Sequence, residues 1–238
     1  YYSLEADKAY MSVSQFKSFL DCEARTMAKL NGEYVEEGNN TALLVGSYVD
    51  SSIEGTLDKF KEENPQIFTQ KGELKADFKK AEEIVRLIKE NELFQKFLSG
   101  EKQVILTFEL FGIWWKIKMD SFVRDICITD LKTARNTEGI VKWRYDYQGT
   151  IYQKGVELNG LGTLPFYLAV ATKEDIPDLN IFQIPQSTLD LALSEIADLI
   201  EHVIEVKSGK IAPTRCEKCD YCKRTRKTTI RNYNELLE

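Results

Sequence analysis

Two aspartates and a lysine, Asp120, Asp130 and Lys132, lie close together in residues 119–133, MDSFVRDICITDLKT. If residues 126–132 form a strand, its period of two places Asp130 and Lys132 on one face. A tight turn before this strand would fold the preceding run back as a hairpin and bring Asp120 toward Asp130. Carboxylate oxygens are the ligands that Mg²⁺ prefers, and a neighbouring lysine can orient or deprotonate a water and offset charge on a phosphorane-like transition state. The spacing therefore indicates metal-assisted phosphodiester hydrolysis, and the alternative is an ordinary solvated, salt-bridged strand face.

Four of the five cysteines are candidates for a second site. Cys216, Cys219 and Cys222 follow one another at three-residue spacing, and Cys22 lies far upstream. Because no secretory signal precedes them, disulfides are the less expected use of such a group. The alternative is three reduced surface thiols and a buried Cys22. Cys127 falls in an apolar strand and is interpreted as a small buried hydrophobe.

Length and charge limit the class of protein. The chain has 238 residues, 43% of them hydrophobic, which suits one large domain or one domain with appendages. A net charge of −6 argues against a wholly basic nucleic-acid binder but leaves room for a local basic groove. No apolar run approaches the ~20 residues of a membrane span, and the first residues lack a signal peptide, so no membrane association and a cytoplasmic location are expected.

The C-terminal stretch is the most basic part of the sequence. Lys223, Arg224 and Arg226 lie just after the cysteines, where they could contact DNA phosphates or form a solvated tail. His202, the only histidine, has no serine or cysteine nearby in sequence. This argues against a Ser-His or Cys-His hydrolase and favours a structural role for His202.

The hydrophobic periodicity predicts helices that alternate with strands. Gly46 and Asp50 are four residues apart on the second helix, and Tyr145, Gln148 and Tyr152 share one face of a later helix. Helices are expected at residues 12–30, 41–60, 76–90, 92–98, 141–159 and, capped by Ser187, 187–207; strands are expected at residues 103–111, 113–123, 126–132, 163–173 and 179–185. The predicted fold class is mixed α/β (α+β), with a central mixed sheet of about five strands flanked by helices.

The sequence resembles the PD-(D/E)XK nuclease superfamily, and within it the RecB-like and RecE-like branch of phage and prophage exonucleases and the iron–sulfur nucleases. The resemblance spans nearly the whole chain, and its motifs occur in the expected order: Ser12-x-Ser14, Cys22, Gly46-x-x-x-Asp50, Asp120, Asp130-Leu131-Lys132, Gln148-x-x-x-Tyr152 and the C-terminal cysteines. It implies a restriction-endonuclease-like core in a single domain over residues 1–238. That domain would have a helical N-terminal part (1–100), a catalytic core (101–206) and a cysteine-rich basic tail (207–238).

The resemblance assigns metal ligands and the catalytic lysine. Asp120, Asp130 and the main-chain carbonyl of Leu131 match the ligands of Mg²⁺ or Mn²⁺, and Lys132 matches the catalytic lysine. Asp50 stands where related nucleases commonly carry a histidine, and an aspartate can still bind such an ion, directly or through water. The implied chemistry is in-line hydrolysis of a DNA phosphodiester with one or two metal ions.

The resemblance also assigns a DNA contact and a possible second cofactor. Gln148 and Tyr152 match a helix motif that contacts DNA near the scissile phosphate and belongs to the catalytic set. Cys22 and the three C-terminal cysteines match the nucleases in which an iron–sulfur cluster staples the N-terminal helix to the C-terminus. Four thiolates suit either a [4Fe–4S] cluster or Zn²⁺.

Three functions remain open on the sequence alone. The first is a Mg²⁺-dependent exonuclease of phage recombination that digests duplex ends and hands the strand to a RecT-like annealing protein, with a monomer or a homo-oligomer left open as its state. The second is an endonuclease or a CRISPR-adaptation-type nuclease of the same fold. The third is a catalytically silent DNA-binding module, against which the joint presence of Asp120, Asp130 and Lys132 argues.

Overall fold

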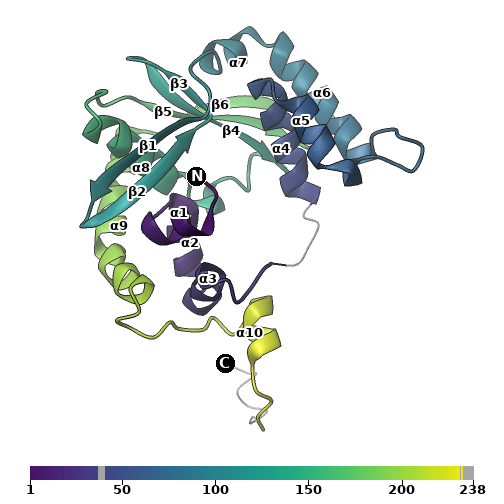
Figure 1. Ribbon diagram of the computed structural model, residues 1–238. Helices are drawn as coiled ribbons and strands as arrows, with labels where there is room; N and C mark the ends of the chain where they lie inside the picture. Colours follow the sequence, from purple (N-terminus) through teal and green to yellow (C-terminus); the bar gives the residue numbers. More distant parts are fainter. Residues whose placement is uncertain (37–40, 231, 233–238) are drawn as a thin grey trace.

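The computed structural model describes residues 1–36, 41–230 and 232 as a mixed sheet with helices on both faces (Figure 1). The helices are α1 (Leu4–Ala9), α2 (Val13–Asp21), α3 (Glu23–Leu30), α4 (Thr41–Glu54), α5 (Leu57–Glu63), α6 (Ala76–Glu90), α7 (Glu92–Phe97), α8 (Tyr145–Leu158), α9 (Gln186–Lys207) and α10 (Asp220–Thr225), with 3-10 turns η1 (Pro65–Ile67) and η2 (Val141–Trp143). The strands are β1 (Val104–Leu110), β2 (Ile113–Met119), β3 (Ser121–Val123), β4 (Cys127–Ala134), β5 (Phe166–Thr172) and β6 (Leu179–Gln183). The end of the basic tail, at 231 and 233–238, lies outside the described residues.

The strands form two sheets. In the four-stranded sheet, of order β3-β4-β5-β6, β4 and β5 are parallel and the outer pairs are antiparallel. Strands β1 and β2 form a separate antiparallel hairpin. The expected run 113–123 is divided at Asp120, so that its first part pairs with β1 and its last three residues pair with β4. The mixed fold with flanking helices is confirmed, and its strands are shared between a hairpin and a larger sheet.

The sheet separates two apolar cores. On one face, α2, α8, α9 and the β1–β2 hairpin enclose buried residues such as Phe16, Trp115 and Ile151. On the other face, α4, α6 and α7 pack through residues such as Tyr48 and Ile84. Strand β4 contributes to both cores because its side chains alternate between the two faces.

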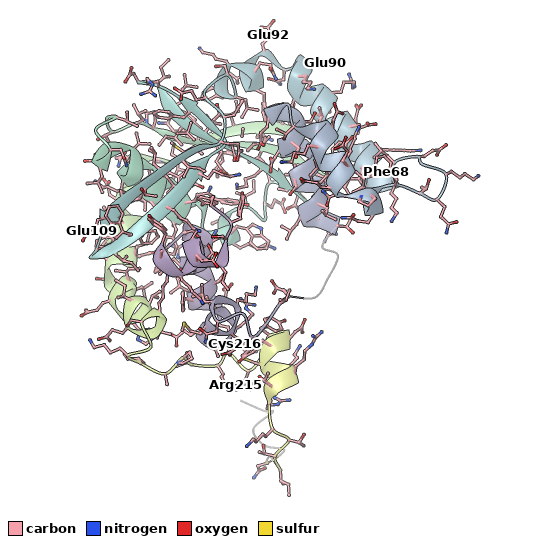
Figure 2. The ribbon with its side chains drawn as sticks, viewed as in Figure 1. Phe68, Glu90, Glu92, Glu109, Arg215 and Cys216 are labelled. Carbon is pink, nitrogen blue, oxygen red and sulfur yellow. The ribbon has the colours of Figure 1, made fainter. Side chains whose placement is uncertain are left out.

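Helix α8 connects the parallel strands β4 and β5, and a parallel pair requires such a crossover. It lies against the β1–β2 hairpin at Gly155, where an added Cβ would come within 2.5 Å of Phe108 and 2.6 Å of Ile117. A side chain has no room there, so the glycine fixes how closely α8 approaches the hairpin. Glu109, on the same hairpin, points outward and is exposed (Figure 2).

Several predicted helices are interrupted in the structure. The helix expected at 12–30 breaks at Cys22, whose extended backbone ends α2 and begins α3, while Ser12 caps α2 as predicted. The helix expected at 41–60 ends at Glu54 because Gly55 takes a left-handed conformation (φ +80°). The helix expected at 141–159 is divided by left-handed Arg144 (φ 50°).

Two features of the C-terminal half differ from expectation. Helix α9 begins at Gln186, after the extended Pro185, so Ser187 lies inside the helix and does not cap it. The tail predicted as cysteine-rich and basic contains a short helix, α10, that the sequence pattern did not predict. Among the described residues, no helix is both long enough and apolar enough to span a bilayer.

Candidate active site and cysteine cluster

The register of β3 on β4 brings Asp120 to Asp130. Ser121 pairs with Thr129, so continuing the antiparallel register by one residue places Asp120 opposite Asp130. The carboxylate of Asp120 is fixed there because its Oδ2 accepts a hydrogen bond of 3.0 Å from the backbone N–H of Leu131. The predicted hairpin is therefore confirmed, and it anchors Asp120 on the strand that carries Asp130 and Lys132.

Asp130 is buried and holds two partners. The ammonium of Lys132 forms an ion pair with its Oδ2, and Gln148 Nε2 donates a hydrogen bond of 2.7 Å to its Oδ1. Burial, opposed by Lys132 and reinforced by Asp120, raises the pKa of Asp130 to about 7. Burial alone would lower the pKa of Lys132, but the charges of Asp130 and Asp120 outweigh it and raise that pKa. The lysine therefore stays an ammonium at neutral pH.

Helix α4 contributes carboxylates from the other face of the sheet. Burial, followed by the charge of Asp120, raises the pKa of Asp50 well above its usual value. Glu54, one turn later, accepts a hydrogen bond from Gln103 Nε2, which also lies 3.5 Å from Asp120 Oδ1. Gly46 lets α4 lie against β4, since an added Cβ would sit 3.2 Å from Thr133 Oγ1. Close packing at Gly46 thus positions Asp50 near the strand carboxylates.

The donor set fits a hard divalent cation. Asp50, Asp120 and Asp130 supply oxygen ligands, and their mutual repulsion is the kind that a bound cation relieves. Oδ2 of Asp130 is buried and, within the described residues, accepts no regular hydrogen bond, while the Lys132 ammonium forms an ion pair with it. In the described part of the chain, the three aspartates are less tightly grouped than the cysteines.

The hydroxyl of Tyr152 is engaged in a hydrogen bond with the backbone. Its hydroxyl donates a hydrogen bond of 2.9 Å to the carbonyl of Lys118, and its side chain is buried. Tyr145, on the same face of α8, has its ring centroid 5.5 Å from the Lys132 ammonium. Gln148 therefore contacts the Asp130 carboxylate directly, whereas Tyr152 ties α8 to the strand that leads to Asp120.

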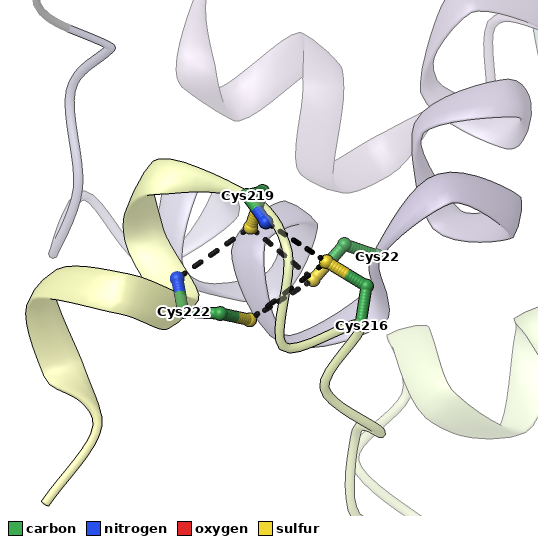
Figure 3. Close-up of side chains that lie close together, drawn as sticks. All are labelled: Cys22, Cys216, Cys219 and Cys222. Atoms are coloured by element: carbon green, nitrogen blue, oxygen red, sulfur yellow. Dashed lines mark hydrogen bonds between the residues drawn. The ribbon is translucent and has the colours of Figure 1, made fainter. Parts of the chain in front are cut away.

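The four candidate cysteines converge (Figure 3). Their ligand atoms all lie within 4.8 Å of one another. The Sγ atom of Cys22 is 3.6 Å from that of Cys222 and 3.8 Å from that of Cys219, and the sulfurs of Cys216 and Cys222 are 4.0 Å apart. Figure 2 shows Cys216 beside α10, away from the sheet. The structure thus brings together all four predicted thiols, while Cys127 is buried separately in β4.

Backbone amides support the cysteine cluster. Cys216 Sγ accepts hydrogen bonds from the N–H groups of Lys218 (3.5 Å) and Cys219 (3.3 Å), and these bonds lower the pKa of Cys216 to about 6. Cys219 Sγ accepts a further bond of 3.5 Å from the N–H of Cys222. Such bonds favour thiolates, the form that binds metals.

A carboxylate joins the helices next to this cluster. Glu23 accepts hydrogen bonds from Thr214 N (2.7 Å) and Thr214 Oγ1 (2.8 Å), and it contacts His202 Nε2 at 2.7 Å. His202 therefore has the kind of structural contact that was expected. Tyr221 packs against the cysteines.

The basic residues of the tail are not brought to the carboxylates. Lys223 and Arg224 lie on α10 and Arg226 follows it, and in Figure 1 this helix is at the end of the molecule opposite the sheet. Any DNA contact from these side chains would be distant from Asp130.

Three residues near the site were not singled out from the sequence. Glu54 follows Asp50 by one helical turn, a spacing that could have identified it. Gln103 and Lys17 carry no such signal because they reach the site only through the tertiary fold.

Comparisons with known proteins agree with this geometry. A family model described as a PDDEXK-like domain of unknown function (DUF3799) matches residues 12–225. A crystal structure described as a "putative exonuclease" from Eubacterium rectale shares 46% sequence identity, with a TM-score of 0.94 over 99% of this chain and 96% of that one. A crystal structure of SSO0001 shares 16% identity over 87% of this chain and 93% of that one, and its TM-score of 0.31 is too low to argue for a shared fold. No match was found among curated proteins.

Proposed function

Because the chain belongs to the family of PDDEXK-like domains, we propose that it is a divalent-metal-dependent exodeoxyribonuclease. The proposal rests chiefly on Asp130, which contacts Lys132 and Gln148 and lies next to Asp120. The name of the similar Eubacterium rectale protein favours an exonuclease over an endonuclease. A role in phage recombination, with a RecT-like partner that takes up the product strand, is the biological setting we propose.

Each residue of the site has a distinct task in this proposal. Asp120, Asp130 and Asp50, with the carbonyl of Leu131, would hold Mg²⁺ or Mn²⁺. When bound, the ion supplies charge stabilisation to the attacking and leaving oxygens. Lys132 offers a permanent ammonium to the charge that develops on the phosphate. Gln148 holds the Asp130 carboxylate in place, and the buried position of the pair keeps these charges effective by excluding water.

The decisive experiment compares linear and closed circular duplex DNA in Mg²⁺. An exonuclease degrades the linear form and spares the circle, and end-labelling then gives the polarity of digestion. Cutting of the circle would favour the endonuclease alternative. Lys132→Ala should abolish cleavage of either form, and cleavage retained by the purified variant would refute the assignment of the site.

Lys116 offers a matched control for Lys132. It too is a lysine paired with an aspartate, 2.6 Å from Asp7, and it lies on β2, outside the four-stranded sheet. Lys116→Ala removes a paired ammonium as Lys132→Ala does, but it leaves the carboxylate site intact. We expect it to lose stability and to keep cleavage at temperatures where it is folded.

For the cysteine cluster we propose a single tetrahedral Zn²⁺ in preference to a [4Fe–4S] cluster. Four thiolates at about 2.3 Å from one zinc ion lie about 3.8 Å from each other in a tetrahedron. Three of the six Sγ–Sγ separations, at 3.6, 3.8 and 4.0 Å, match this value, and all four sulfurs lie within 4.8 Å of one another. A four-iron cube holds its thiolates farther apart, because each cysteine binds a different iron.

Metal analysis of anaerobically purified protein tests this choice. Colourless protein with one zinc per chain supports the proposal, and brown protein containing iron and inorganic sulfide would overturn it. Cys222→Ser should lose the zinc. Cys127→Ser provides the control, because Cys127 is also a buried cysteine but lies apart from the cluster, in β4.

A further inference from the structure

An exposed tryptophan, Trp143, lies just before α8 and has no role in the site described above. Trp143 ends the turn η2, and its side chain is 57% exposed. Its neighbour Val141 is 83% exposed. Large apolar side chains that remain this exposed at the rim of a site often mark a binding surface.

A chain of contacts connects Trp143 to Lys132. The ammonium of Lys17, on α2, donates a hydrogen bond of 2.8 Å to the backbone carbonyl of Trp143. The same ammonium lies 5.5 Å from the ring centroid of Tyr145, and Lys132 lies 5.5 Å from that centroid as well. Tyr145 thus lies near both ammonium groups, and Lys17 ties the backbone of Trp143 to this cluster.

Two lysine ammonium groups lie near this point. Burial, followed by the positive charge of Lys132, lowers the pKa of Lys17, while the carboxylates of Asp130, Asp146 and Asp21 oppose that shift. A phosphate bound between Lys17 and Lys132 would offset the repulsion between the two ammonium groups. Lys142, 5.5 Å from the ring centroid of Trp143, adds a third cation to the same surface.

An apolar groove adjoins the same surface. It is lined by Ile140, Val141, Tyr145, Phe182 and other residues between η2 and β6. Tyr145 belongs both to this groove and to the surroundings of Lys132. The segment before α8 therefore offers an apolar face for a base and cations for a phosphate, side by side.

We propose that Trp143 and Lys17 form a nucleotide-binding subsite beside the scissile phosphate, in which the indole stacks on a base and the ammonium contacts the adjacent phosphate. The inference rests on the proposed nuclease function and specifies its substrate. Stacking requires a base with an accessible face, so the subsite would take an unpaired nucleotide at the DNA end. Base–aromatic stacking is tolerant of sequence, so no base preference is expected.

The test measures binding of end-labelled single-stranded DNA to the Lys132→Ala protein in Mg²⁺. The DNA is either intact or carries one abasic residue at successive positions from its end. Trp143→Ala should weaken binding of intact DNA about 10-fold, or about 1.4 kcal/mol, within the range of base stacking. With the abasic residue at the stacked position, the same substitution should change binding less than about twofold, because the base it stacks on is already absent.

Trp114 is the matched control for Trp143. It is a tryptophan of similar exposure, 51%, which packs on Tyr10. Trp114→Ala should leave binding of both DNAs unchanged. Equal losses for Trp143→Ala on intact and abasic DNA, or no loss on either, would overturn the subsite.

A second measurement does not depend on removing Trp143. In Trp114→Phe protein, Trp143 is the exposed indole and Trp115 is fully buried, so quenching by bound DNA reports on Trp143. Quenching should fall when the stacked position is abasic, and unchanged quenching would contradict the proposal. Lys17→Gln keeps an N–H donor for the Trp143 carbonyl and should lower the slope of log affinity against log salt by about 0.7.

Cleavage by the unmodified protein is scored separately. A protein that cleaves DNA but binds intact and abasic DNA alike refutes the subsite and leaves the nuclease function standing. A protein that does not cleave but shows the Trp143 effect refutes the nuclease function and leaves the subsite standing.

Discussion

Replacing Gly155 by alanine should loosen the helix that carries Gln148. An added Cβ would lie 2.5 Å from Phe108 Cε1 and 2.6 Å from Ile117 Cδ1, both far inside normal contact. Phe108 and Ile117 are buried in the core between α8 and the hairpin, so neither can move aside without displacing its own neighbours. Overpacking of this kind costs about 1–3 kcal/mol.

Helix propensity acts in the opposite direction. Alanine is favoured over glycine within a helix by about 1 kcal/mol. Contacts as short as 2.5 and 2.6 Å put the overpacking cost in the upper part of its range, about 2–3 kcal/mol, so the net effect of Gly155→Ala should be a loss of about 1–2 kcal/mol in the free energy of unfolding. Cleavage should also fall several-fold, because a displaced α8 weakens the 2.7 Å hydrogen bond from Gln148 to Asp130.

Gly46→Ala is the matched control for this substitution. Gly46 is also within a helix, but its added Cβ would meet a single atom, Thr133 Oγ1, at 3.2 Å. The gain in helix propensity should then equal or slightly exceed the cost of this contact, so the free energy of unfolding should rise by about 0–0.5 kcal/mol. Urea unfolding measures the stability of both variants, because a shift of the midpoint at an unchanged m value reports a change in the free energy of unfolding. A Gly155→Ala protein as stable as the wild type, or more stable, would refute the reasoning.

Three further predictions follow from contacts of single residues. Tyr152→Phe should lower stability by about 1 kcal/mol through loss of the hydrogen bond to the Lys118 carbonyl and should keep cleavage within about threefold, as a nuclease assay with matched unfolding curves would measure. Chelation of the cluster metal should expose 212–225 to limited proteolysis while the sheet core stays protected, since α10 packs on α3. Burial lowers the pKa of Lys207 to about 8. The stability of the wild type relative to Lys207→Met should therefore be highest above about pH 10.5 and should be lost as the pH falls through about 8. Urea titrations at a series of pH values measure this difference.

The spacing of residues predicted the strand part of the site well. A strand period of two placed Asp130 and Lys132 on one face, and a short turn returned Asp120 to them; both relations are local and appear in the structure. The pattern also predicted α6 correctly to the residue, because its apolar positions recur at helical spacing in a segment without glycine or proline.

What the sequence did not predict depends on contacts between distant segments. The break at Cys22 requires no glycine or proline, and it appears where this residue turns toward the C-terminal cysteines. Nothing in the sequence indicated that the hydroxyl of Tyr152, a residue expected to contact DNA, donates a hydrogen bond to a backbone carbonyl on β2. Lys17 lies near the Tyr145 ring, and so near Lys132, only because α2 packs beside α8. Periodicity carries no information on such pairings.

The carboxylates lie at the boundary between the two apolar cores, which has a consequence for motion. Asp50 belongs to the helical layer of α4, whereas Asp120 and Asp130 belong to the sheet, and like charges across this boundary push the two layers apart. The apolar contacts of α4 and α6 work against that push. The repulsion between these carboxylates therefore opposes the packing of α4 on the sheet. Neutralising its charges, by protons or by a cation, should slow amide hydrogen exchange in α4 more than in α8.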